Sequence, residues 1–309
     1  MKNNSNIFVA GGRGMVGSSI IRNLSIGGYK NIISPTSDEL DLRDQQATSC
    51  FFRSNKIDYV FLVAAKVGGI LANASYKAEF IYDNLMIQNN VIHQSMQNNV
   101  KKLLFLGSSC IYPKKPKLPI SEKELLQGEL EKTNDAYAIA KIAGIKMCQS
   151  YQEQYGFNAI SAMPTNLYGE NDNFDLKNSH VIPALIRKFY EAKKSHADTV
   201  VCWGTGQPMR EFLYVDDLAD ACVFLMKQYS GKSHVNIGTG KDISIRELSE
   251  LISNLVGYDG DIVWDKTKPD GTYRKLLDVK KINSLGWYSS TSLEEGLKKT
   301  IKFYDNIST

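Results

Sequence analysis

Three glycines spaced three residues apart, between a short apolar run and a helical pattern, limit the possible folds of this chain more than any other feature. The apolar run 7–10 precedes Gly11, Gly14 and Gly17, and apolar residues at helical spacing follow over 15–24. A glycine turn between a strand and a helix lets the backbone approach a pyrophosphate, which binds the free N–H groups and positive dipole of the helix N-terminus. The sequence therefore predicts a dinucleotide-binding loop, with an ordinary strand–helix turn as the alternative. Its residues are Gly11, Gly12, Arg13, Gly14, Met15, Val16 and Gly17.

The first half of the chain repeats this alternation of short apolar runs and helical patterns. Further strands are predicted at 32–33, 59–63, 102–106 and 159–163. Strands that alternate with helices form parallel sheets with right-handed crossovers. We therefore expect an α/β fold, a doubly wound parallel Rossmann sheet with helices on both faces.

The pattern changes after residue 165. A smaller C-terminal α/β unit is predicted from a helix over 183–194, a strand over 200–203, a helix over 245–256 and a turn at 268–271. We therefore divide the chain into a cofactor-binding domain over 1–165, to which the chain returns around 207–237, and a substrate-binding domain over 166–309.

Composition gives no support to nucleic-acid-binding or metal-binding classes of protein. The 309 residues carry a net charge of +4 with no long block of like charge, which suits an anionic small molecule better than a nucleic acid. The five cysteines show no C-x-x-C pair or zinc spacing, so we expect a reduced protein without a metal site. Neither a signal peptide nor a membrane-spanning stretch is recognisable, and a cytoplasmic location is expected.

The tip of the predicted second strand indicates which dinucleotide binds. NAD enzymes usually place an acid there to hold the ribose 2′-hydroxyl, but residues 34–37 contain none. Arg13 offers a cation close to the glycine loop, and the hydroxyls of Thr36 and Ser37 suit a phosphate, which favours NADP(H). Asp41 either meets the adenine or is a solvated turn acid.

Tyr137 and Lys141 stand at i and i+4, on one face of a predicted helix. Reduction of a ketone needs a proton for the developing alkoxide, and a nearby ammonium is expected to lower the pKa of a phenol toward the neutral range. Taken alone, such a pair is better explained as a surface contact. The preceding strand, however, ends in a turn over 107–110, from which Ser108 can direct its hydroxyl at the same carbonyl oxygen. The three residues together predict hydride transfer at a carbonyl carbon.

These motifs resemble the extended short-chain dehydrogenase/reductase family and, within it, the GDP-L-fucose synthases. The resemblance covers nearly the whole chain in matching order. It rests on VGGI at 67–70, GSSCIYP at 107–113, YAIAKIAGIK at 137–146, PTNLYG at 164–169, DNF at 172–174, NSHVIPAL at 178–185, WGTGQPMREF at 203–212 and KPDGT at 268–272. It implies that GDP-4-keto-6-deoxy-D-mannose is epimerised at C3 and C5 and reduced at C4 with NADPH, which gives GDP-L-fucose.

The resemblance assigns the epimerase chemistry to Cys110 and His180. Inversion beside a C4 ketone requires one group that removes a proton and another that returns a proton to the opposite face, and a thiol and an imidazole can fill these roles. Ser108 and Tyr137 would stabilise the enolate and the alkoxide. A buried, inert thiol is the alternative for Cys110. Among the other histidines, His93 and His234 are predicted to be structural, and His196 lies in a polar loop.

Further contacts are implied by the same resemblance. Near the nicotinamide they are Leu106, Gly107, Ser108, Lys141, Pro164, Thr165, Asn166, Leu167 and His180, and near the nucleotide sugar they are Lys188, Trp203, Arg210 and Asp270. The arginine fork suits a diphosphate and the indole offers an aromatic surface. The alternatives for the last four are a helix-face lysine, a core aromatic, a surface salt bridge and a turn acid. One departure concerns the second strand, because some family members carry basic residues where this chain has Pro35, Thr36 and Ser37.

Three other functions stay open. A 4-reductase acting on a related GDP-sugar, such as a heptose derivative, would not need Cys110 and His180. A regulator that binds NADP without turnover would not need Tyr137 and Lys141, and a nucleic-acid-binding module would need a basic stripe that the chain lacks. By analogy we expect a homodimer formed through a four-helix bundle that includes the Tyr137 helix, and no membrane partner.

Overall fold

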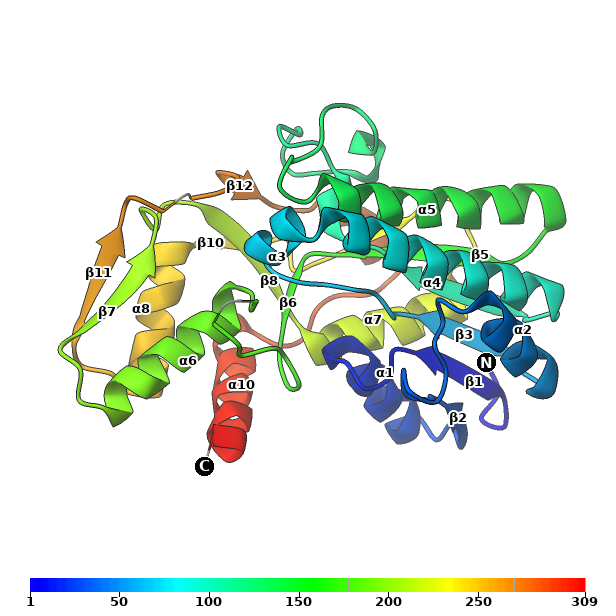
Figure 1. The fold of residues 1–309 in the computed structure, drawn as a ribbon, viewed down its shortest axis with the longest axis horizontal. Coiled ribbons are helices and arrows are strands. Elements are labelled where there is room, and N and C mark those ends of the chain that lie inside the picture. Colours follow the sequence, from blue (N-terminus) through cyan, green and yellow to red (C-terminus); the bar gives the residue numbers. More distant parts are fainter. Residues whose placement is uncertain (177, 269, 309) are drawn as a thin grey trace.

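The computed structural model describes residues 1–176, 178–268 and 270–308, and Figure 1 shows them as a larger part and a smaller part packed together. The predicted turn at 268–271 includes Pro269, which lies outside the described residues. Within the described ranges, no helix combines the length and the apolar character that crossing a membrane requires.

A six-stranded parallel sheet forms the larger part, with the strand order β2-β1-β3-β4-β5-β9. Its strands are β1 (Asn6–Ala10), β2 (Asn31–Ile33), β3 (Tyr59–Leu62), β4 (Lys102–Leu106), β5 (Ala159–Pro164) and β9 (Val235–Ile237). The first five confirm the predicted strands to within one residue at each end. The sixth comes from a distant part of the chain and completes the sheet beside β5.

Helices cover both faces of this sheet, which confirms the doubly wound arrangement. On one face α1 (Met15–Ile26), α7 (Val215–Gln228) and α9 (Lys280–Ser284) bury apolar side chains against Ile7 and Phe61. On the other face α2 (Gln45–Ser54), α4 (Lys77–Gln97) and α5 (Asp135–Tyr155) do the same against Phe8 and Phe105. The long helices α4 and α5 lie side by side (Figure 1). Helix α3 (Ile70–Ser75) precedes α4, and the 3-10 turns η1 (Ser109–Ile111) and η2 (Glu122–Glu124) precede α5.

The smaller part is built on β8 (Met209–Tyr214). It pairs antiparallel with β10 (Asp242–Ser244) and parallel with β6 (Asn166–Tyr168) and β12 (Arg274–Lys275), while β7 (Thr199–Trp203) pairs with β11 (Asp261–Asp265). Helices α6 (Val181–Lys194), α8 (Ile245–Val256) and α10 (Leu293–Ser308) share one apolar core with these strands. The helices predicted over 183–194 and 245–256 and the strand over 200–203 are confirmed.

The chain passes between the two parts more than once. It leaves the large sheet after β5, and after β8 it returns there with α7 and β9. Strand β8 itself belongs to the smaller part. The division into domains at residue 165 stays a prediction.

Candidate active site

One cleft of about 1380 Å³ runs between the carboxyl ends of the large sheet and the smaller part. In open α/β sheets this edge is where ligands bind. Every residue that the sequence predicts for catalysis, cofactor binding or substrate binding lines this cleft, from the glycine loop at one end to Trp203, Arg210 and Asp270 at the other. Their shared location is a finding of the structure, whereas their individual roles stay predictions.

The glycine loop is shaped for a phosphate. Gly11 has a φ of +91°, a conformation that side chains disfavour, and a Cβ on Gly17 would lie 2.1 Å from the Gly11 carbonyl oxygen. Helix α1 begins here without a side-chain N-cap and without an acid in its first turn. Its first N–H groups therefore lack a side-chain acceptor, and the residues present fit the pyrophosphate of a dinucleotide.

The segment that follows β2 carries a charged network that the sequence only partly indicated. Asp41 lines the cleft but forms a bidentate ion pair with Arg43, with 2.9 Å from Nε to Oδ1 and 2.8 Å from Nη2 to Oδ2. These contacts hold the pKa of Asp41 below its usual value. Asp41 is therefore an exposed, paired acid at the cleft wall. Arg13 also lines the cleft.

The predicted reductase residues meet where β4 ends and α5 begins. Ser108 precedes η1 and its Oγ accepts a hydrogen bond from the Cys110 N–H at 3.4 Å. Helix α5 brings Tyr137 and Lys141 onto the same wall. The Lys141 Nζ donates to the Leu106 carbonyl at 2.8 Å and lies 5.7 Å from the centre of the Tyr137 ring.

The expected lowering of the Tyr137 pKa is wrong in this structure. Burial raises the pKa of Tyr137 above its ordinary value, the Cys110 thiol acts in the same direction, and only Ser108 opposes them. Burial also lowers the pKa of Lys141 to about 8, so part of its charge is lost near neutral pH. The phenol is thus held in its protonated form, the form that can donate a proton to an alkoxide.

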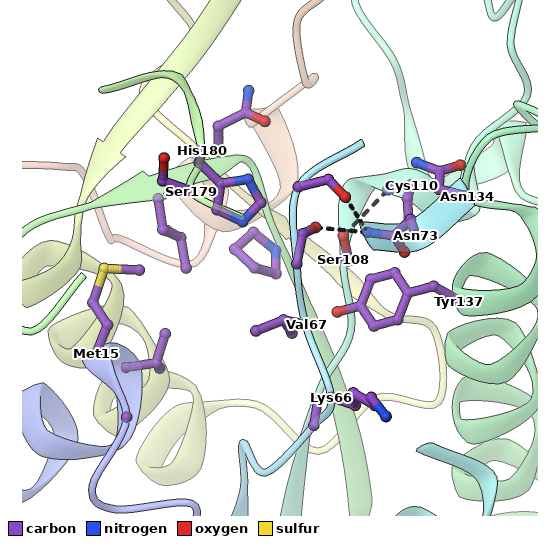
Figure 2. A pocket seen from close by; sticks show the side chains of 18 of the residues that line it. Met15, Lys66, Val67, Asn73, Ser108, Cys110, Asn134, Tyr137, Ser179 and His180 are labelled. Carbon is purple, nitrogen blue, oxygen red and sulfur yellow. Dashed lines mark hydrogen bonds between the residues drawn. The ribbon is translucent and has the colours of Figure 1, made fainter. Parts of the chain in front are cut away.

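Cys110 and His180 lie on opposite walls of the cleft. Figure 2 shows His180 and Ser179 across from Ser108, Cys110 and Tyr137. Burial raises the pKa of the Cys110 thiol and lowers the pKa of His180, which stands at the N-terminus of α6. The other histidines lie outside the cleft, and two of them bond to tyrosines: His93 Nδ1 to Tyr151 at 2.8 Å and His234 Nε2 to Tyr112 at 3.0 Å.

The predicted sugar-nucleotide residues surround the far end of the cleft. The Trp203 side chain is half exposed, with Lys188 Nζ and Lys268 Nζ 5.8 Å and 5.5 Å from the centre of its ring. It is therefore not a core aromatic. Arg210 is a partly buried cation whose pKa burial lowers. Asp270 accepts hydrogen bonds from the Thr205 N–H at 2.7 Å and the Thr205 hydroxyl at 2.8 Å, so it also fixes a turn.

Several polar residues that line the cleft were missed from the sequence, among them Asn73, Asn134, Ser179 and Lys275. The Asn73 Nδ2 donates to the Gly68 and Gly69 carbonyls at 2.6 Å and 3.0 Å (Figure 2). Asn134 is the N-cap residue of α5, three positions before Tyr137. Lys275 lies three positions beyond the KPDGT segment, and its short strand gives no pattern that could have indicated its place in the site.

Comparisons with known proteins agree with this geometry. Residues 7–238 match the model of the NAD dependent epimerase/dehydratase family. GDP-L-fucose synthase 1 of Arabidopsis thaliana is 59% identical over 96% of this chain and 92% of its own length. A GDP-6-OMe-4-keto-L-xylo-heptose reductase from C. jejuni has a TM-score of 0.94 at 41% identity, over 99% of both chains. A GDP-L-fucose synthetase from Naegleria fowleri with bound NADP has a TM-score of 0.93 at 30% identity, over 100% of this chain and 95% of that one.

Proposed function

This chain belongs to the NAD dependent epimerase/dehydratase family, and from that premise we propose that it converts GDP-4-keto-6-deoxy-D-mannose to GDP-L-fucose. It combines 3,5-epimerase and NADPH-dependent 4-reductase activities in one cleft. The observation that carries the proposal is the position of Cys110 and His180 on opposite walls, with Ser108 and Tyr137 on the wall of Cys110. The similarity to the Arabidopsis synthase along almost the whole of both chains supports the same substrate.

Epimerisation needs the ketone oxygen to be held while protons leave and return. Ser108 and Tyr137 can donate hydrogen bonds to that oxygen, which stabilises the enolate formed when a neighbouring C–H proton is removed. Cys110 and His180 are the two titratable groups on opposite walls. One takes the proton from C3 or C5, and the other returns a proton to the opposite face of the sugar.

Reduction uses the same oxygen contacts. When bound along the glycine loop, NADPH supplies the hydride for C4. Tyr137 gives its phenolic proton to the alkoxide, and its raised pKa keeps that proton in place until the charge develops. Lys141, fixed by the Leu106 carbonyl, lies beside the phenol and can stabilise the phenolate that remains.

Arg13 is proposed to bind the 2′-phosphate that distinguishes NADPH from NADH. Arg13 lies in the glycine loop and lines the cleft, and the carboxylate of Glu39, in the segment after β2, already accepts a hydrogen bond from the Thr36 N–H at 2.7 Å. Arg13→Ala is expected to raise the KM for NADPH about 10-fold, because a charge-assisted hydrogen bond is lost, and to leave the KM for NADH nearly unchanged. Initial-rate kinetics with both cofactors measure this. Arg53→Ala, which removes an exposed cation on α2, is the matched control. Equal changes for both cofactors would contradict the role.

The alternative functions have less support. A 4-reductase without epimerase activity would leave the placement of Cys110 and His180 unexplained. The C. jejuni heptose reductase is also less similar in sequence to this chain than the Arabidopsis synthase is. A non-catalytic NADP-binding regulator would not need Tyr137 and Lys141 on one wall with Ser108.

Deuterium labelling tests the proposed function. Enzyme, NADPH and GDP-4-keto-6-deoxy-D-mannose are mixed in deuterated water, and the product is examined by NMR. We expect GDP-L-fucose that carries deuterium at C3 and C5. A reduced product without deuterium at these carbons would show that the enzyme is a 4-reductase and would exclude the epimerase activity.

We also propose a cytoplasmic homodimer. Helices α4 and α5 present exposed apolar side chains, with Tyr82 61%, Ile139 48% and Tyr155 53% accessible. Pairing these helices with those of a second copy would bury them in a four-helix bundle. Light scattering should give twice the mass of the chain, and Ile139→Glu should shift it toward the single-chain mass. A wild-type protein of single-chain mass at micromolar concentration would contradict the dimer.

A further inference from the structure

We propose that Lys275 is a positioning residue for Cys110, and that its ammonium, held beside the thiol by β12, stabilises the thiolate that acts as a base. The proposal deepens the proposed function, because it concerns the state of Cys110 that epimerisation requires. Sequence reasoning assigned no role to Lys275.

The backbone around Lys275 is fixed from two sides. In β12, Lys275 is in register with Arg210 of β8. Just beyond it, the Leu277 N–H donates to the buried carboxylate of Glu211 at 2.9 Å. Ile120, on the segment that follows Cys110, exchanges two backbone hydrogen bonds of 2.8 Å with Leu276 and Asp278. The strand that carries Lys275 is thus anchored to β8 and to the loop after Cys110.

Lys275 and Cys110 also share two cavities. Both line the large cleft, and both line a small adjoining pocket, together with Lys114, Glu131, Asn134 and Thr272. Glu131 is paired with Lys114 at 3.2 Å. Among the residues that the structure describes, the Lys275 ammonium makes no ion pair. The thiol is therefore the group beside it that can become an unpaired anion.

Cys110 and Lys275 each shift the pKa of the other toward its charged form. Burial raises the pKa of Cys110, while Lys275, the Ser108 hydrogen bond and Lys141 lower it, in that order. Burial lowers the pKa of Lys275, the Cys110 thiolate and Glu131 raise it, and Arg210 lowers it. Each partner thus favours the charged form of the other, against the cost of burying a single charge.

The resulting proton transfer is simple. A neutral Lys275 amine accepts the proton of the Cys110 thiol, which gives an ammonium and a thiolate, and no other bond changes. The thiolate then accepts a proton from the carbon beside the ketone. Without a cation at position 275, burial alone would keep Cys110 as the thiol, which is a poor base.

A titration of Cys110 without substrate tests this independently of the proposed function. Thiolate is followed by its ultraviolet absorbance against pH, and the titration of a Cys110→Ser variant is subtracted. Lys275→Met is expected to raise the midpoint by about one pH unit or more, equivalent to about a 10-fold loss of thiolate at a fixed pH below both midpoints. Lys275→Arg, which keeps the charge, should stay near the wild-type midpoint.

Two controls distinguish the effect of the lost Lys275 charge from an effect on folding. Lys268→Met removes a cation that lies over Trp203 and should leave the midpoint of Cys110 unchanged. Circular dichroism confirms that each variant is folded. A Lys275→Met midpoint within about 0.3 unit of wild type, or equal shifts in the Met and Arg variants, would overturn the proposal. A shifted midpoint in an enzyme that incorporates no deuterium at C3 and C5 would leave the Lys275 contact standing and reject the epimerase function.

Discussion

Tyr137→Phe is expected to lower kcat for reduction of the 4-keto sugar by about 10²–10⁴-fold, the usual effect of removing a positioned proton donor. The phenylalanine keeps the ring, which packs edge-on against Phe80 with centroids 6.2 Å apart. Only the hydroxyl is lost, so the fold and the cofactor loop should be preserved. Oxidation of NADPH at saturating substrate, followed by absorbance, measures the effect.

The same substitution should also slow epimerisation, because the enolate and the alkoxide share one oxygen site. Deuterium incorporation at C3 and C5 in the absence of NADPH should fall, although less than reduction, since Ser108 still donates to that oxygen. Tyr155→Phe is the matched control, because Tyr155 ends the same helix with an exposed side chain and lies outside the cleft. If Tyr137→Phe kept a third or more of the wild-type reduction rate, Tyr137 would not be the proton donor.

The local parts of the site could be predicted from the sequence. The glycine loop requires only a strand, a turn and a helix in succession, and the Tyr137–Lys141 spacing requires only one helix. Both follow from neighbours along the chain. The strands of the large sheet that precede residue 165 were indicated for the same reason, because each contains consecutive apolar residues that differ from the helical patterns around them.

Pairings between distant segments could not be predicted in this way. Strand β12 has two residues and β6 has three, which is too short for an alternating pattern to be recognised in the sequence. Only their pairing with β8 identifies them as strands. Lys275 enters the site only through that pairing. For the same reason, the predicted lowering of the Tyr137 pKa was wrong, because the burial that raises this pKa depends on residues from several elements.

Cys110→Ser offers the sharpest separation of the two activities. Serine keeps the size of the side chain but has a hydroxyl that does not ionise near neutral pH, so it cannot replace a thiolate base. Deuterium incorporation at C3 and C5 is expected to fall by about 10²–10⁴-fold. Reduction at C4 does not require the thiol, and the variant should release a reduced sugar that keeps the substrate's configuration at the carbons that Cys110 serves. Mass spectrometry and NMR of the product measure both outcomes.

A second buried cysteine supplies the control that makes this result specific. Cys148 is free and buried on α5, like Cys110 it has a pKa raised by burial, and it lies outside the cleft. Cys148→Ser should therefore show how a buried hydroxyl affects the stability of the fold, without changing a group that takes part in epimerisation or reduction. His180→Gln should resemble Cys110→Ser in losing inversion, because a proton removed on one face is not returned on the other. If Cys110→Ser and Cys148→Ser lowered exchange and reduction in the same proportion, the thiol would be a packing residue and the cleft would hold a reductase alone.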